Sequence, residues 1–125
     1  MSNIYDQHRA AFSNVSAFII MKGTDRVASV AIKFPRDGAG RLYAYVHFFG
    51  MPMVRGFAGG YGYDKRTAAV EDAMKKIDPQ YFTADHWKES REECEKFVAA
   101  VSKARDGTDW TDMFRNAGYA VLQAV

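Results

Sequence analysis

Two stretches of this sequence hold residues from which a binding site could be built. The first is a predicted strand over residues 41–49, in which aliphatic residues alternate with basic and aromatic ones. Because successive side chains of a strand point to opposite faces, the basic and aromatic set shares one face. Such a face could stack on nucleobases or anchor a protein partner, unless a helix or a second copy of the chain covers it. Its members are Arg41, Tyr43, Tyr45, His47 and Phe49.

The second stretch is a glycine-rich segment that joins a strand pattern to a helix pattern. Gly59, Gly60 and Gly62 are a candidate phosphate loop, since backbone N–H groups near a helix N-terminus can hold a phosphate. Lys65 and Arg66 follow at once and would add positive charge. The segment lacks the Gly-Lys-Ser/Thr ending of a Walker loop, and no parallel βαβ unit surrounds it.

The alternative interpretation of this segment is structural. Glycines supply the positive φ angles that a tight strand-to-helix connection needs. Asp64, at the same helix end, would compete with a bound anion. The sequence leaves both interpretations open.

Groups that could perform catalysis or bind a metal are sparse. His8, His47 and His86 are far apart, and the sequence lacks the dense Cys and His set of a zinc site. Cys94 falls on the apolar stripe of a predicted helix, which favours a buried thiol over a nucleophile. We therefore expect a binding protein without metal or cofactor; the enzymatic alternative is His47 acting with a nearby carboxylate.

Length and composition indicate one globular domain over residues 1–125. The hydrophobic share of 48% and charged share of 26% are ordinary for a soluble protein. No apolar run approaches the roughly 20 residues that span a bilayer, the first residues lack a secretory pattern, and a single cysteine excludes an internal disulfide. These features predict a cytoplasmic protein that does not enter the membrane.

Charge is distributed unevenly along the chain. Residues 1–66 hold nine Lys or Arg and four Asp, a net charge of +5, whereas residues 67–125 carry −3. This asymmetry predicts one surface that attracts anions. A long acidic helix with a solvated outer side would produce the same asymmetry.

The first half of the chain is expected to form a helix followed by an antiparallel meander. Short connections with turn residues favour antiparallel pairing of neighbouring strands. The sheet would have three or four strands. The helix is predicted over residues 3–12 and the strands over residues 15–22, 26–34, 41–49 and 53–58.

Three helices are expected to follow, which makes the fold α+β. The first, residues 65–77, begins after Asp64 and is stopped by Asp78-Pro79. The second runs from Thr83 or Asp85 to Arg105. Its expected buried stripe is Trp87, Cys94, Phe97, Val98 and Val101. A short third helix, capped by Thr108, carries Trp110, Met113 and Phe114. Residues 119–125 are apolar, and their pattern does not decide between helix and strand.

Residues 56–77 resemble the C-terminal part of a double-stranded RNA-binding domain. The likeness rests on the run from Gly60 to Met74, in which glycines precede a small basic cluster and then alanines. It implies a core of helix, three strands and helix, to which the two later helices would add a C-terminal extension that has no counterpart in that family. It also implies that Lys65 and Arg66 touch phosphates across a groove. The sequence differs from that pattern in its fourth strand, its two-membered basic cluster and Asp64.

The whole chain also looks like the small single-domain proteins of phages and mobile elements, with residues 37–47 as its most similar part. Many such proteins block host nucleases or defence complexes, and the likeness implies an anti-CRISPR or anti-restriction type of inhibitor in the host cytoplasm. The leading hypothesis is nucleic-acid binding through Arg41, Arg55, Lys65 and Arg66, supported by the aromatic residues. The alternative is an inhibitor that binds a host protein complex, and a homodimer is compatible with either.

Overall fold

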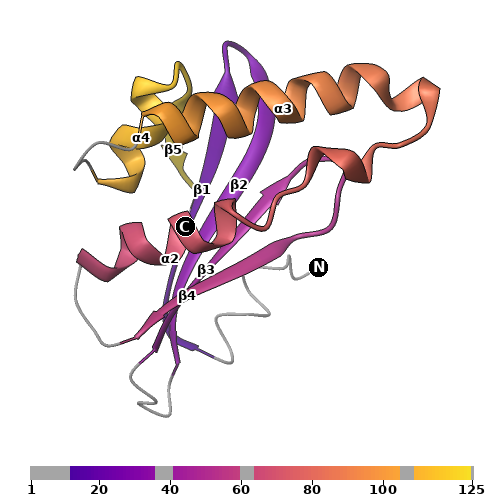
Figure 1. The fold of residues 1–125 in the computed structure, drawn as a ribbon. Coiled ribbons are helices and arrows are strands. Elements are labelled where there is room, and N and C mark those ends of the chain that lie inside the picture. The colour runs from indigo at the N-terminus through magenta and orange to yellow at the C-terminus, as the bar shows by residue number, and fades with distance from the viewer. Residues whose placement is uncertain (1–11, 36–40, 60–63, 105–108, 125) are drawn as a thin grey trace, which may run out of the picture.

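The computed structural model describes residues 12–35, 41–59, 64–104 and 109–124. It consists of an antiparallel sheet with helices packed on one side (Figure 1). The predicted helix over residues 3–12 lies outside the described residues, except for Phe12, which begins the first strand. The elements are β1 (Phe12–Lys22), β2 (Asp25–Pro35), β3 (Arg41–Phe48), β4 (Val54–Gly59), α2 (Asp64–Met74), the 3-10 turns η1 (Pro79–Tyr81) and η2 (Asp85–Trp87), α3 (Lys88–Lys103), α4 (Trp110–Asn116) and β5 (Ala120–Gln123).

Within the described residues the sheet has five strands, in the order β4-β3-β2-β1-β5. The prediction of three or four strands was therefore too low, because residues 120–123 form a strand that pairs antiparallel with β1. Gly118, with φ of +99°, ends α4 and turns the chain back toward β1. The Ala124 N–H then donates to the Ala17 carbonyl at 2.7 Å. The last strand in the chain thus lies beside the first.

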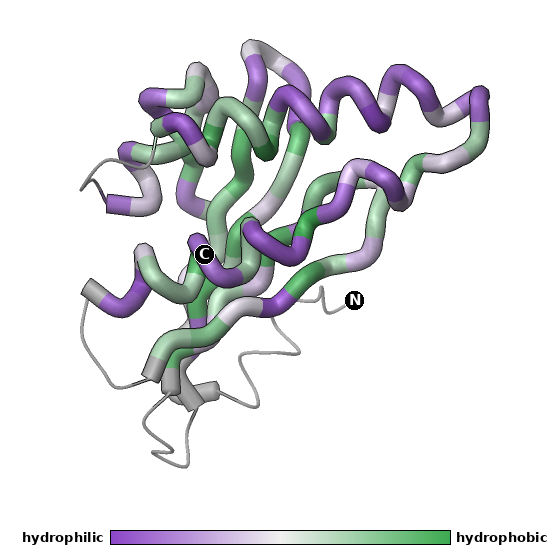
Figure 2. The backbone as a smooth tube through the Cα atoms, in the orientation of Figure 1, coloured by the Kyte–Doolittle hydropathy of each residue, from purple (hydrophilic) through white to green (hydrophobic). Residues whose placement is uncertain are grey.

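One face of the sheet carries the hydrophobic core. Val30, Ala44 and Val46 are fully buried on this face, and the strands are predominantly hydrophobic whereas α3 is predominantly hydrophilic (Figure 2). The helices supply the other side of the core. Its buried members are Val70 of α2, the predicted Cys94, Phe97 and Val101 of α3, and the predicted Trp110, Met113 and Phe114 of α4, whereas Val98 is partly buried against them.

Ring contacts connect the later helices to this face. The Phe97 ring of α3 lies 5.4 Å from the Phe48 ring, and the Trp110 ring of α4 lies 4.8 Å from the Phe18 ring. Phe48 pairs with Ala28 and Phe18 pairs with Val30, so both rings point to the core side. All three described α-helices therefore cover the same face.

The prediction for the second helix was wrong at Trp87. It was expected to be buried, but its side chain is 45% exposed. The α-helix begins only at Lys88, after a 3-10 turn that contains Trp87. The different backbone geometry of that turn moves Trp87 off the buried stripe of α3.

Gly56 allows α2 to lie directly on β4. A Cβ atom at this position would overlap the backbone N of Ala73 and the carbonyl O of Ala69, and would lie 2.8 Å from the Ala73 Cα. Small residues at all three positions therefore permit backbone-to-backbone contact between helix and strand. The glycine here is needed for space, because its φ angle is not among the positive ones.

Side chains of α2 and of the turn that follows it also cover the outer edge of β4. The Phe57 N–H donates to Asp72 Oδ2 at 3.1 Å, and Lys76 Nζ donates to the Arg55 carbonyl at 2.6 Å. Lys76 and Asp72 form an ion pair at 3.3 Å. The Phe57 N–H, followed by Lys76, holds the pKa of Asp72 below its ordinary value. These contacts occupy groups with which another strand could otherwise pair.

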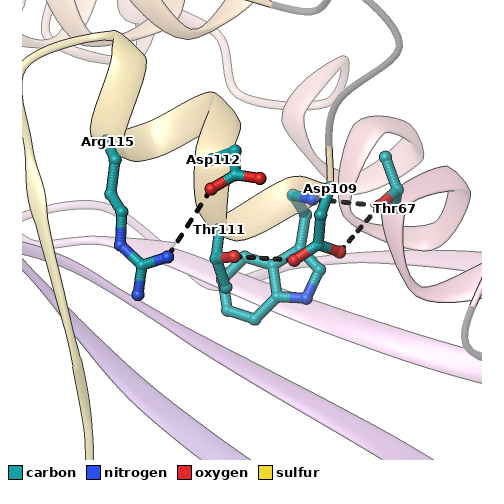
Figure 3. A network of polar contacts seen from close by, with 6 residues as sticks. Thr67, Asp109, Thr111, Asp112 and Arg115 are labelled. Carbon is teal, nitrogen blue, oxygen red and sulfur yellow. Dashed lines mark hydrogen bonds and ion pairs between the residues drawn. The ribbon is translucent and has the colours of Figure 1, made fainter.

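A polar network attaches α4 to α2 (Figure 3). The Trp110 N–H donates to Thr67 Oγ1 at 3.0 Å, so a hydroxyl from α2 caps the first turn of α4. Asp109 accepts from Thr67 Oγ1 at 3.4 Å and from Thr111 Oγ1 at 2.6 Å. The predicted cap, Thr108, lies outside the described residues, and Asp109 occupies the N-cap position.

Candidate nucleic-acid interface

The opposite face of the sheet carries the aromatic and basic residues of β3 and β4. Because Ala44 and Val46 point into the core, their neighbours point the other way. Strand pairing then sets Tyr45 opposite Arg55 and Tyr43 opposite Phe57. We call the following residues the aromatic face: Tyr43, Tyr45, His47, Phe49, Arg55 and Phe57.

The rings and cations of the aromatic face lie close together. The Arg55 Cζ lies 5.4 Å from the centroid of the Tyr43 ring, and the Tyr43 and Phe57 centroids are 6.3 Å apart. The His47 and Phe49 rings meet edge to face at 5.2 Å. Their arrangement is compatible with offset stacking of further planar groups.

Accessibility differs across this face. Phe57 is 50% exposed, Arg55 is exposed, and the four ring-bearing residues of the 43–49 series are half-buried. On the adjacent strand β2, Ser29, Ala31 and Lys33 are buried. The accessible surface is therefore the part over β3 and β4.

Lys33 is a buried cation beside the aromatic face. It pairs with Tyr43 across the β2–β3 ladder, and its Nζ lies 3.7 Å from the centroid of the Tyr45 ring. Burial lowers the pKa of Lys33 to about 7. Lys33 and Phe57 were not among the site residues predicted from the sequence. Period-2 alternation combined with hairpin pairing would have placed both beside Tyr43 and Tyr45.

The predicted basic residues do not all meet on this face. Arg55 lies on it, whereas Lys65 and Arg66 are half-buried in the first turn of α2. Because α2 packs on the Gly56 side of β4, the sheet separates these two residues from the aromatic face. Arg41 pairs with Gly59 at the end of β3, and its side chain lies outside the described part of the structure.

The candidate phosphate loop falls mostly beyond the described ranges. Gly59 is the last residue of β4, whereas Gly60 and Gly62 lie within residues 60–63, which are not described. The helix that follows these residues, α2, lies on the core side of the sheet and carries Lys65 and Arg66 in its first turn.

Cys94 is a buried thiol, as predicted. It faces Met51, with 4.0 Å between the two sulfur atoms, and burial raises its pKa to about 11. The protonated form therefore dominates at neutral pH, which disfavours a nucleophilic role. Within residues 12–35, 41–59, 64–104 and 109–124, no three His, Cys, Asp or Glu side chains gather as metal ligands.

Two further observations concern the whole chain and its likeness to known proteins. None of the helices in the described ranges is long and apolar enough to cross a membrane. Compared with protein-family models, curated proteins and solved structures, the chain has no match. Its function is therefore inferred from the geometry of its own surfaces.

Proposed function

We propose that this chain is a non-enzymatic nucleic-acid-binding protein that holds a single strand against the aromatic face. The observation that carries the proposal is the accessible strip over β3 and β4. Here Arg55 and the half-exposed Phe57 ring lie beside Tyr43 and Tyr45. None of the described positions that β3 and β4 direct to this face is acidic.

The chemistry of this strip matches a single strand in two ways. Bases can stack on aromatic rings, at ~1–3 kcal/mol per base, whatever their sequence. Arg55 can neutralise a phosphate and release its counterion. Lys76, whose Nζ lies 5.8 Å from the centroid of the Phe57 ring, is ion-paired with Asp72 at the edge of β4, so the positive charge of this strip comes mainly from Arg55.

An accessible strip of rings favours unpaired bases over a duplex. Bases in a duplex are stacked on each other, so their faces cannot reach protein rings. The resemblance to a double-stranded RNA-binding domain points instead to Lys65 and Arg66, on the other side of the sheet. The two surfaces therefore make different predictions about the preferred nucleic acid.

Fluorescence anisotropy tests the proposal with labelled strands of about 12 nucleotides as RNA, DNA and duplex RNA. We expect Arg55→Ala and Phe57→Ala each to weaken single-strand binding by about tenfold. Arg55→Ala should also reduce the slope of log K against log salt by ~0.7, while Phe57→Ala leaves that slope unchanged.

The matched control is the double variant Lys65→Ala/Arg66→Ala. It should leave single-strand affinity intact if the aromatic face is the site. A selective loss of duplex binding in this variant would instead assign function to the N-terminus of α2. The absence of any binding at ~50 mM salt would overturn the proposal.

The alternative function is an inhibitor that binds a host nuclease or defence complex. It is favoured by exposed aromatic side chains that lie outside the aromatic face, namely Tyr81 and Trp87. A pull-down from host lysate, with and without nuclease treatment, separates the two functions. A stoichiometric protein partner that survives nuclease treatment would favour the inhibitor.

A further inference from the structure

The segment between α2 and α3 presents two large aromatic side chains to solvent. Tyr81 is 54% exposed in η1 and Trp87 is 45% exposed in η2. Figure 1 shows this segment at the end of α3 that is distant from α4. Exposed Tyr and Trp side chains that lie near each other are typical anchors of protein interfaces.

Internal contacts hold both aromatic residues in place. The buried Phe82 ring contacts both, with its centroid 5.4 Å from that of Tyr81 and 6.1 Å from that of Trp87. Asp78 accepts the Gln80 N–H at 2.9 Å and so caps η1. The surface is therefore formed before any partner arrives, which reduces the entropic cost of binding.

Arg91 stabilises the same arrangement from α3. Its Nη1 donates to the Phe82 carbonyl at 2.9 Å in a partly buried contact. This bond connects the segment to the helix that follows it.

Acidic residues outnumber basic ones along the stretch that carries the two rings, with five Asp or Glu against two Lys or Arg over residues 78–93. Asp85 and Glu89 are exposed on either side of Trp87 in the sequence, and Asp78 is exposed before Tyr81. Lys88 is exposed among them, and the exposed His86 ring lies 5.0 Å from the Trp87 ring. Negative charge repels phosphates, so this surface is unsuited to nucleic acid, whereas cations are attracted both to carboxylates and to aromatic ring faces.

We propose that Tyr81 and Trp87 bind an arginine- or lysine-bearing segment of a protein partner. One cationic side chain of the partner lies over an exposed ring, and Asp85 or Glu89 pairs with its charge. This site goes beyond the proposed nucleic-acid function and does not depend on it, because none of its residues belongs to the aromatic face.

Titration of the full chain with a hexa-arginine peptide tests the proposal, with hexalysine and hexaglutamate in parallel. Affinities come from the anisotropy of labelled peptides, so that variants without Trp87 can be measured. Intrinsic fluorescence provides a second readout in the parent protein, because the other tryptophan, Trp110, is only 3% exposed. We expect saturable binding of the cationic peptides and a change in Trp87 emission.

Tyr81→Ala and Trp87→Ala should each weaken hexa-arginine binding by about fivefold or more, the effect of losing a moderate cation–π contact. Asp85→Asn/Glu89→Gln should weaken it and reduce its dependence on salt. Phe57→Ala, which removes an equally exposed ring elsewhere, should leave the affinity unchanged. Trp87→Phe retains a ring and should keep most of the affinity if the folded structure is intact.

Three results would overturn the proposal. One is the absence of saturable binding up to about 1 mM peptide, the weak end of specific association. The second is equal binding of hexa-arginine by Tyr81→Ala, Trp87→Ala and the parent chain. The third is equal binding of hexaglutamate, which would mean that charge does not select the partner.

Discussion

At the scale of single residues, Lys33 makes stability depend on pH. Its side chain is fully buried, and burial lowers its pKa from 10.5 to about 7. Between these two values the unfolded chain binds more protons than the folded chain, so stability should rise with pH. The cost of burying the charge is fully present below about pH 7.

Replacing this cation with an apolar side chain of similar length should remove that cost. We predict that Lys33→Met raises the free energy of unfolding at pH 6 by roughly 1–3 kcal/mol. It should also flatten the rise between pH 7 and pH 10.5. Urea denaturation at several pH values measures both effects. Lys22→Met, at an exposed position paired with Glu93, is the control and should change little. A loss of stability in Lys33→Met across the whole pH range would contradict the prediction.

At the scale of elements, the contact between β4 and α2 depends on Gly56. Any larger residue must push the helix away, because the atoms it would meet belong to the backbone of Ala69 and Ala73. We predict that Gly56→Ala lowers the free energy of unfolding by ~1–3 kcal/mol. It should also weaken hydrogen-exchange protection in α2.

The neighbouring variant Arg55→Ala supplies the control for this prediction. Arg55 points to the opposite face, where its side chain is exposed, so its truncation should change stability by less than ~0.5 kcal/mol. If Gly56→Ala were as stable as Arg55→Ala, this would contradict the close backbone contact between α2 and β4.

The helices and strands also show how much of the secondary structure could be predicted from the sequence. Period-2 alternation predicted β2 and β3 closely, because each has one face in the core. It left residues 119–125 open, because a four-residue edge strand has too few residues to show a period. Helical spacing likewise assigned Trp87 to a buried stripe, since periodicity does not reveal where a 3-10 turn replaces an α-helix.

At the scale of the whole molecule, the candidate site was only partly predictable. Alternation along β3 is enough to group Tyr43, Tyr45 and His47, because that grouping is local. Whether Lys65 and Arg66 join them depends on which face α2 covers, and small residues such as Gly56 determine that through tertiary packing. A motif that spans a strand and a helix therefore does not establish a shared surface.

The pairing of the last strand with the first gives the final prediction. Val121 pairs with Ile20 and packs against the core, whereas Leu122 pairs with Ile19 and is 53% exposed. Val121→Ala should therefore cost ~1–2 kcal/mol of unfolding free energy, and Leu122→Ala should stay within ~0.5 kcal/mol.

Deleting residues 120–125 should cost more than either substitution. It turns β1 into an edge strand and exposes an apolar run that includes Phe18 and Ile20 to pairing with other chains. We expect a lower denaturation midpoint together with concentration-dependent light scattering. A shortened chain that unfolds at the parent midpoint and stays monomeric would show that the sheet does not need β5, and that β1 is protected by other means.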